Sequence, residues 1–525
     1  MIATATGDHT SVRLTMASML LRTVERHPDR DAIVYDGRRW SYAEWNARVN
    51  RTAHALAELG VRPYDRVALL MNAGEPVVTL YFACQKLGAA AVPMNFRLST
   101  GEVAHVLSDS GARLLAYDGS LAETALTAVE RAKGVSEFIV AESDDPPAGH
   151  HDYESLAESG RGHDPLITSE VRPEMLSALV YTSGTTGLAK GVMHTHANDI
   201  AIAMNCALEY QLGPEDRALH IAPLYHVGGM QAFLVPHVLV GAANVILSRF
   251  EPRGALQAIQ AERVTALYAV PTQISTMLLH RGAFDVSSLQ MVTTGGATLR
   301  ERTMERVLGG FCPRLYNGYG LTEASLTLLM NPRDALRKLG SCGKATLLSE
   351  TRIVVHDPDR DVLPDEEVDG EAIGELLVRG PHTTPGYWNK PRENAARLRH
   401  GWLYTGDLFS RDFEGYHYFH GRADDMIVSG GENIYPSEVE DVLHRCPGVR
   451  AAVVMGMPDS RWGAAVTAFI ERAEPTLSEQ DVDRFCKQSD LLASFKRPRR
   501  VVFVDALPTN PSGKVLTREL VDRFG

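Results

Sequence analysis

The segment VYTSGTTGLAKGV (residues 180–192) follows an apolar stretch, MLSALV, that predicts a buried strand. A Gly-rich loop after a strand can present backbone N–H groups and hydroxyls to phosphate oxygens, and Lys190 adds a positive charge. The Walker A spacing fails, because Lys190 follows Ala189 and precedes Gly191. We therefore predict a different phosphate-binding loop, with a helical run from about His196. On composition alone, a surface linker is the alternative.

Bulk composition narrows the class of protein. The chain has 525 residues, which predicts two to four units with their own cores. Its formal charge of -12 argues against a general nucleic-acid binder. The six Cys form no C-x-x-C pair, so we expect scattered buried thiols. The longest apolar region, QAFLVPHVLVGAANVIL, is short for a membrane span and contains Pro and His. We predict a cytoplasmic enzyme, monomeric or homodimeric, with no integral membrane span.

Helical and strand patterns alternate through the N-terminal part. SYAEWNARVNRTAHALAELG (residues 41–60) predicts a helix, RVALLM a strand, EPVVTLYFACQKLG a helix and AAAVPMN a strand. Such alternation predicts an α/β fold with parallel βα-layered sheets in a large N-terminal domain, residues 1–423. Short strands with Gly turns predict a β-rich subdomain at about 345–423. Residues 424–525 predict a small, mobile α+β domain, with a helix that begins at Pro436.

Further motifs follow the loop in a fixed order. They are PLYHVGG (223–229), YNGYGLTEAS (316–325), GWLYTGDL (401–408), GRADDMIVSGGENIYPSEVE (421–440) and LPTNPSGKVLTREL (507–520). Alone, each has a plain reading, such as a tight turn for GYG or a solvated charge for Lys514. Together with the loop, they resemble the adenylate-forming superfamily of acyl-CoA synthetases, peptide-synthetase adenylation domains and luciferases. The chain departs at Ala189, where the family usually has Pro, and has Asp424 where many relatives have Lys.

The resemblance implies ATP, Mg²⁺ and coenzyme A as ligands. Tyr319 would stack on adenine, Thr322 would reach the α-phosphate, and Asp407 would accept bonds from the ribose hydroxyls. The whole implied nucleotide- and cofactor-binding set is Thr182, Ser183, Gly184, Thr185, Thr186, Gly187, Lys190, Gly296, Ala297, Asn317, Gly318, Tyr319, Gly320, Thr322, Asp407, Arg422, Gly430 and Gly431.

The implied catalytic residues are Lys514, Glu323, Thr185 and His226, and Glu323 and Thr185 are also the metal residues. A carboxylate would attack the α-phosphate of ATP, with Lys514 stabilising the charge. The C-terminal domain would then rotate about the hinge Asp424, and a thiol would displace AMP. Gly430 and Gly431 would line the pantetheine tunnel, although a hairpin turn also accounts for them.

The substrate is a small carboxylic acid, and the sequence leaves its type open. PLYHVGG contains no acidic residue, which disfavours an amino acid. Several motifs look most like the aryl-CoA ligases, including 4-chlorobenzoate:CoA ligase. That resemblance implies a pocket of His226, Val227, Gly228, Tyr268, Gly295, Gly296, Gly318 and Leu326. Gly228, Gly295 and Gly318 stand where the chlorobenzoate enzyme has larger residues, so we expect a larger cavity. A bulky aromatic acid such as a hydroxycinnamate, or a medium to long acyl chain, fits that expectation.

The thiol acceptor is expected to be CoA. FKRPRR (residues 495–500) supplies four cations that could meet CoA phosphates, although a solvated basic turn is an equal reading. Loading of a carrier protein remains an alternative.

Overall fold

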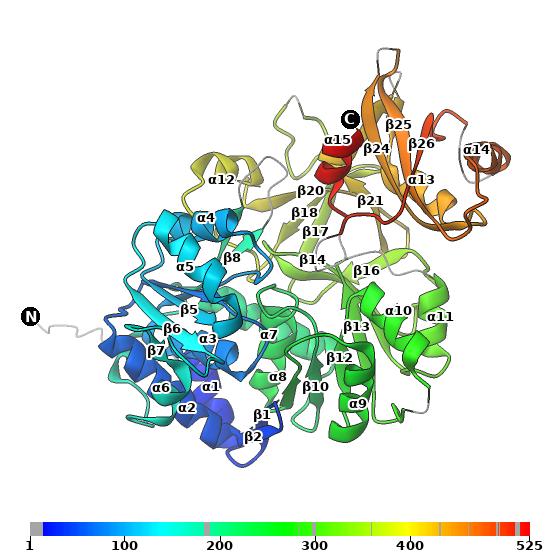
Figure 1. The fold of residues 1–525 in the computed structure, drawn as a ribbon. Coiled ribbons are helices and arrows are strands. Elements are labelled where there is room, and N and C mark those ends of the chain that lie inside the picture. Colours follow the sequence, from blue (N-terminus) through cyan, green and yellow to red (C-terminus); the bar gives the residue numbers. More distant parts are fainter. Residues whose placement is uncertain are drawn as a thin grey trace, which may run out of the picture.

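The computed structural model describes residues 14–182, 189–282, 284–296, 301–358, 360–429, 432–459, 461–489, 492, 494–509 and 515–524 (Figure 1). Three sheets organise these residues. The first has seven strands, in the spatial order β7 (His151–Asp152), β6 (Glu137–Ala141), β5 (Leu114–Asp118), β3 (Arg66–Leu70), β4 (Ala90–Pro93), β8 (Leu176–Thr182) and β9 (Lys190–Thr195). Its strands pair in parallel except for β8 and β9, which form an antiparallel hairpin.

The second sheet has fourteen strands and changes character along its length. Its order is β17 (Glu350–Val354), β18 (Gly374–Arg379), β20 (Trp402–Arg411), β21 (His417–Arg422), β16 (Ser341–Ala345), β15 (Ser325–Met330), β14 (Leu315–Leu321), β13 (Met291–Gly295), β12 (Ala266–Tyr268), β10 (Arg217–His220), β11 (Ala243–Ile246), β1 (Asp31–Tyr35) and β2 (Arg38–Ser41), with β19 (Leu398–Arg399) beside β20. Pairing is parallel from β14 to β1 and antiparallel from β14 through β15 to β17. The antiparallel part includes the strands from β15 to β21, and the subdomain boundary near residue 345 stays a prediction.

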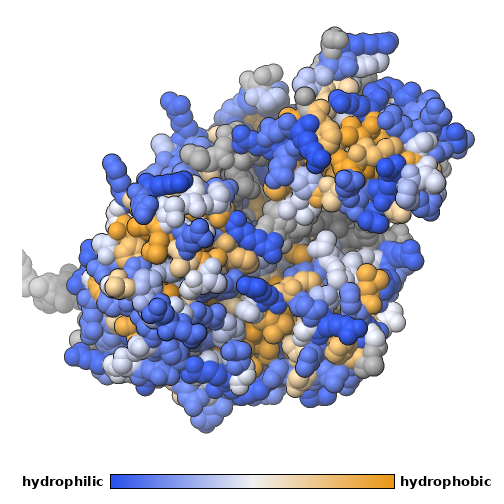
Figure 2. Space-filling model, in the orientation of Figure 1, coloured by the Kyte–Doolittle hydropathy of each residue, from blue (hydrophilic) through white to orange (hydrophobic). Residues whose placement is uncertain are grey.

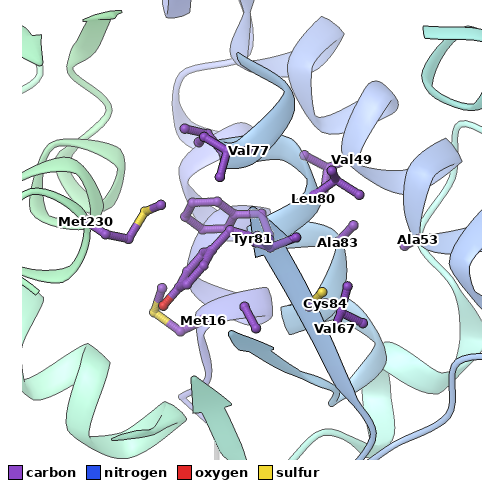
Figure 3. Close-up of a cluster of buried hydrophobic side chains, with 14 of the residues drawn as sticks. Met16, Val49, Ala53, Val67, Val77, Leu80, Tyr81, Ala83, Cys84 and Met230 are labelled. Atoms are coloured by element: carbon purple, nitrogen blue, oxygen red, sulfur yellow. The ribbon is translucent and has the colours of Figure 1, made fainter. Parts of the chain in front are cut away.

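Helices cover both of these sheets (Figure 1). They are α1 (Met16–Arg26), α2 (Tyr42–Glu58), α3 (Glu75–Leu87), α4 (Thr100–Ser110), α5 (Ala122–Arg131), α6 (Tyr153–Glu158), α7 (His196–Tyr210), α8 (Val235–Val240), α9 (Pro252–Glu262), α10 (Pro271–His280), α11 (Glu301–Leu308) and α12 (Pro391–Arg397). A large cluster of buried side chains from α1, α2, α3 and α8 joins the seven-stranded sheet to the strand β1. Figure 3 shows part of this cluster, with Tyr81 at its centre.

The C-terminal residues form a smaller lobe, in orange and red in Figure 1. Its five-stranded sheet has the order β23 (Glu432–Ile434), β22 (Ile427–Ser429), β25 (Gly463–Arg472) and β24 (Val449–Asp459), with β26 (Arg500–Val504) beside β25. The lobe also contains α13 (Pro436–Leu443), α14 (Glu479–Gln488) and α15 (Thr517–Phe524). It has its own buried cluster, which includes Ile434, Val439 and Ile470.

The α/β fold predicted from the sequence is confirmed, and one local expectation is incomplete. The helix α7 begins at His196 as expected, because Thr195 accepts a hydrogen bond from the Asn198 amide and caps it. Between the loop and this helix, however, lies the strand β9, so a hairpin strand and not a helix follows the loop directly. The cysteines are free, and all except Cys342 are buried.

Hydrophilic residues cover most of the face in Figure 2, with smaller hydrophobic areas on both the main body and the small lobe. None of the helices in the described ranges has the length and apolar character that a membrane crossing requires.

Candidate active site

The predicted nucleotide motif lies where the large sheet changes from parallel to antiparallel pairing. β14 pairs in parallel with β13 and antiparallel with β15, and a tight turn, residues 322–324, joins β14 to β15. Ligands of α/β sheets bind at carboxyl ends of strands where the topology changes. Gly320 is required here, because a Cβ atom at this position would overlap the carbonyl oxygen of Ser325.

Tyr319, Asp407 and Arg422 come together although they are far apart in the sequence. The Tyr319 hydroxyl donates to Asp407 Oδ2 at 2.5 Å, and Arg422 Nε lies 3.5 Å from Asp407 Oδ1. Asp407 and Arg422 face each other across the β20–β21 pair. The Tyr319 ring packs against Phe409, with centroids 4.8 Å apart.

The electrostatics of this cluster are those of a buried acceptor. Burial raises the pKa of the Asp407 carboxyl, and the Arg422 charge and Tyr319 hydroxyl oppose that rise only in part. Burial acts to lower the pKa of Arg422, but the negative charge of Asp407 raises it overall. Among the described residues, neither Asp407 Oδ1 nor Arg422 Nε has a hydrogen-bond partner. A buried carboxylate oxygen that is ion-paired but accepts no hydrogen bond is suited to accept one from a ligand hydroxyl.

Glu323 is held from a segment between β18 and α12. Tyr387 donates its hydroxyl to Glu323 Oε1 at 2.7 Å, and the Thr384 amide donates to the Glu323 carbonyl oxygen at 2.7 Å. Burial raises the pKa of the Tyr387 phenol, and the nearby Glu323 charge raises it further. Tyr387 therefore stays a proton donor, and one carboxylate oxygen of Glu323 is kept in place. Sequence reasoning did not find Tyr387.

The hairpin β8–β9 carries the described ends of the phosphate loop. Thr182 ends β8 and Lys190 begins β9, and the two are directly paired. Lys190 Nζ lies 3.5 Å from Glu393 Oε1 of α12. His105 of α4 contacts the Ala189 carbonyl oxygen at 2.9 Å, so this backbone position is held without the usual Pro.

Part of the predicted acyl pocket lies at the ends of the strands β12 and β13. Tyr268 ends β12, and Gly295, at the end of β13, lies opposite Gly318 of β14. Gly296, the next residue, has a positive φ of 78°. Of the other predicted pocket residues, Val227 and Leu326 are buried and His226 is exposed. Asn317, from the predicted nucleotide motif, donates a long hydrogen bond of 3.5 Å to the Ser341 carbonyl oxygen.

The three pocket glycines have close neighbours, and the larger cavity that we expect from them stays a prediction. A Cβ atom at Gly228 would lie 2.7 Å from the Tyr268 hydroxyl, one at Gly295 would lie 2.7 Å from the Gly318 carbonyl oxygen, and one at Gly318 would lie 2.7 Å from Leu326 Cδ1. A side chain at these positions would therefore meet an aromatic ring, a backbone carbonyl or a leucine. The glycines bring the walls closer together.

A cavity of about 580 Å³ lies beside the PLYH loop. Many of the residues that line it lie at the ends of strands, or directly after strands, in both large sheets. They include Pro223 and Tyr225, which precede His226 in the same loop. Arg97 and Arg249 line it and are exposed. In the part of the chain that the structure describes, neither guanidinium has an ion-pair partner, and Arg97 lies over the Phe96 ring at 5.6 Å.

Two predictions concern the C-terminal lobe. Asp424 lies in a single helical turn directly after β21, is mostly exposed, and approaches Arg397 at 4.0 Å. In FKRPRR, Lys496 pairs with Glu438, and Arg497 lies 3.4 Å from Asp483. Two of the four cations are thus already engaged.

Several predicted site residues lie outside the described residues. These are Ser183, Gly184, Thr185, Thr186, Gly187, Ala297, Gly430, Gly431 and Lys514.

Comparisons with known proteins match this geometry. The family described as AMP-binding enzyme matches residues 20–388, and its C-terminal domain matches residues 438–514. The chain is 36% identical over 520 residues to a feruloyl-CoA synthase of an Amycolatopsis species, which covers 97% of this chain and 99% of the relative. It is 34% identical over 496 residues to a long-chain-fatty-acid–CoA ligase of Mycobacterium tuberculosis, covering 93% of each. The structure of o-succinylbenzoate CoA synthetase from Bacillus subtilis, in complex with its acyl-adenylate intermediate, matches with a TM-score of 0.83 and 32% identity, over 96% of this chain and 97% of that one.

Fold, site and relatives define an enzyme that activates a carboxylic acid as its adenylate. The chain belongs to the AMP-binding enzyme family, and within it to the AMP-forming acid–thiol ligases, the acyl-CoA synthetases. Enzymes of this class use ATP and CoA and pass through an acyl-adenylate.

Proposed function

We propose that the acid is a hydrophobic, aromatic one of hydroxycinnamate type, and that this chain converts it to the CoA thioester. The observation that carries the proposal is the pairing of Gly295 with Gly318, where two neighbouring strands face each other without side chains. Two facing glycines expose flat backbone, and a close, flat slot suits a planar ring better than a flexible chain. The relation to feruloyl-CoA synthase supports the same choice.

A fatty acid is the second candidate. Leu326 and the Tyr268 ring close the pocket with side chains that can rotate, and the Mycobacterium tuberculosis relative is a long-chain-fatty-acid–CoA ligase. A chain could enter if these two side chains moved.

In the proposed mechanism the adenine stacks on Tyr319, and the unpartnered Asp407 Oδ1 accepts a bond from the ribose. Thr322 contacts the α-phosphate, and Thr182 through Lys190 hold the outer phosphates. Lys514 neutralises charge as the acid attacks phosphorus. Of the loop, only Thr182, Ala189 and Lys190 are described residues, so the roles of the others and of Lys514 rest on the family resemblance.

A divalent cation fits the described chemistry at Glu323. Its carboxylate oxygens are hard ligands of the kind that Mg²⁺ prefers, and Tyr387 keeps the group oriented. When bound, Mg²⁺ would neutralise phosphate charge. Thr185 would be its neighbour by the family resemblance.

For the acceptor we propose that CoA enters through the 580 Å³ cavity. Arg97 and Arg249 at its lining would meet CoA phosphates, and the apolar interior leads to the loop of His226. This assignment replaces FKRPRR as the main phosphate contact, because Lys496 and Arg497 are paired. The lobe that begins at Asp424 would rotate between adenylation and thioester formation, with residues 1–423 and 424–525 as the two bodies.

The experiment is a pyrophosphate-release screen over aromatic and C4–C16 acids, with and without CoA. We expect the highest kcat/KM for a hydroxycinnamate, and the fatty acid becomes the answer if a C12–C16 acid exceeds it. For the acceptor, Arg97→Ala and Arg249→Ala should raise the KM for CoA and leave adenylate formation unchanged. Arg131→Ala, an exposed arginine on α5, is the matched control. An unchanged KM for CoA in both site variants would refute this entrance.

A further inference from the structure

A buried histidine from the strand after the phosphate loop contacts the turn that carries the α-phosphate residue. His194 lies in β9 and is about 1% exposed. Its Nε2 atom lies 3.0 Å from the Thr322 carbonyl oxygen, 128 positions away in the chain. Its Nδ1 atom lies 3.0 Å from Asp199 Oδ1 of α7.

The partners decide the protonation of this ring. A backbone carbonyl only accepts hydrogen bonds, so Nε2 carries a proton toward Thr322. Asp199 Oδ2 already accepts from Ser177 at 2.6 Å and from the Tyr81 hydroxyl at 3.2 Å, so Asp199 acts as an acceptor toward Nδ1 too. Nε2 is therefore the atom that donates to the Thr322 carbonyl, and Asp199 holds the opposite side of the ring.

Three successive carbonyl groups at this turn, those of Leu321, Thr322 and Glu323, each accept a hydrogen bond. The Leu321 carbonyl accepts from the Ala324 amide at 3.1 Å, and the Glu323 carbonyl accepts from the Thr384 amide at 2.7 Å. His194 supplies the bond for the carbonyl between them, at Thr322. Without His194 the middle carbonyl of a buried turn would lose its partner, which leaves the turn free to shift.

The position matters because Thr322 belongs to the site. A phosphate contact depends on placement to within a fraction of an ångström, and a hydrogen bond to the same residue's backbone restricts it. His194 also lies four residues after Lys190, so the strand that leaves the phosphate loop is the one that holds the α-phosphate turn.

We infer that the His194–Asp199 pair is a positioning device that sets the Thr322 contact to the α-phosphate of the nucleotide. The inference rests on the proposed role of Thr322 and is independent of the identity of the acid or the thiol. His194 is a positioning residue, since it acts through the Thr322 backbone and does not touch the nucleotide itself.

Binding of AMP and of adenosine, measured by calorimetry, isolates this role, because only AMP has the phosphate. His194→Asn keeps a donor near the Nδ1 position, facing Asp199, and loses the one facing Thr322. His194→Gln keeps a donor near the Nε2 position. His237→Asn is the matched control, because His237 is equally buried, its Nδ1 contacts the Phe233 carbonyl at 2.6 Å, and its ring packs against Phe233 and His220, away from the turn at Thr322 in the sequence.

We expect the preference of the wild-type protein for AMP over adenosine to fall about tenfold in His194→Asn, with adenosine affinity unchanged. His194→Gln should keep most of the preference, and His237→Asn all of it. If His194→Asn does not fold, Asp199→Asn should lower the preference about threefold, since it weakens the hold on the ring.

If His194→Asn prefers AMP over adenosine as strongly as the wild-type protein does, the inference about His194 is overturned and the role of Thr322 is not. Equal weakening of AMP and adenosine, matched by His237→Asn, would also overturn it, because that result indicates a general packing defect. A wild-type protein that binds AMP and adenosine equally would overturn the Thr322 role and the inference together.

Discussion

The unpartnered oxygen of Asp407 leads to a quantitative prediction for Asp407→Asn. Asp407 Oδ1 is buried and has no hydrogen-bond partner within the described residues, while Oδ2 is already engaged by Tyr319. A ribose hydroxyl that donates to a buried carboxylate contributes about 1.5–3 kcal/mol. We therefore expect Asp407→Asn to raise the KM for ATP by roughly 10- to 150-fold, with a smaller change in kcat.

A second substrate turns this into a double-mutant cycle. 2′,3′-Dideoxy-ATP lacks both ribose hydroxyls. In the wild-type enzyme its KM should therefore exceed the KM for ATP by a similar factor. Asp407→Asn keeps only a neutral amide oxygen as acceptor, so it should distinguish ATP from dideoxy-ATP clearly less than the wild type does. The assay is pyrophosphate release at saturating acid. If Asp407→Asn discriminates between the two nucleotides as strongly as the wild type does, the hydroxyls bind elsewhere and the reasoning is refuted.

Three further predictions follow from named contacts. Tyr387→Phe removes the hydroxyl that donates to Glu323. The Mg²⁺ concentration for half-maximal pyrophosphate release should therefore rise about tenfold. An unchanged Mg²⁺ dependence would contradict this prediction. Gly295→Ala places a Cβ atom 2.7 Å from the Gly318 carbonyl oxygen. The KM for an aromatic acid should therefore rise at least about tenfold, with the KM for ATP unchanged. Equal changes in both KM values would count against a pocket role for Gly295. Burial raises the pKa of Glu440 from 4.5 to about 7, so wild-type stability should fall as the pH rises from 4.5 to 7. Urea unfolding should find Glu440→Gln more stable by about 3 kcal/mol at pH 8 and equal at pH 4. A pH-independent difference would contradict this prediction.

The fold could be predicted from the sequence because its signals are local. The helix α7 begins at His196 and α13 at Pro436, where capping residues and Pro mark helix starts. The strand β9 was missed, because six residues between a Gly-rich loop and a strong helix cap carry too little periodicity to show. The direction of pairing in the large sheet also needed the structure.

The site could be predicted only in part. Tyr319, Asp407 and Arg422 were identified from short motifs, and the structure brings them together. Contacts such as His194 with Thr322 depend on side chains from separate elements and leave no signal in a local pattern.

In acyl-adenylate formation the enzyme joins a carboxylate to the α-phosphate of ATP. The most direct test supplies ferulate labelled with ¹⁸O in its carboxylate, together with ATP, Mg²⁺ and CoA, and measures the label in the products by mass spectrometry. If the screen selects a fatty acid, the same label is placed on that acid. We predict one ¹⁸O atom in AMP and none in pyrophosphate, because the acid oxygen bonded to phosphorus leaves with AMP. Unlabelled AMP, or label in inorganic phosphate with ADP as the product, would contradict it.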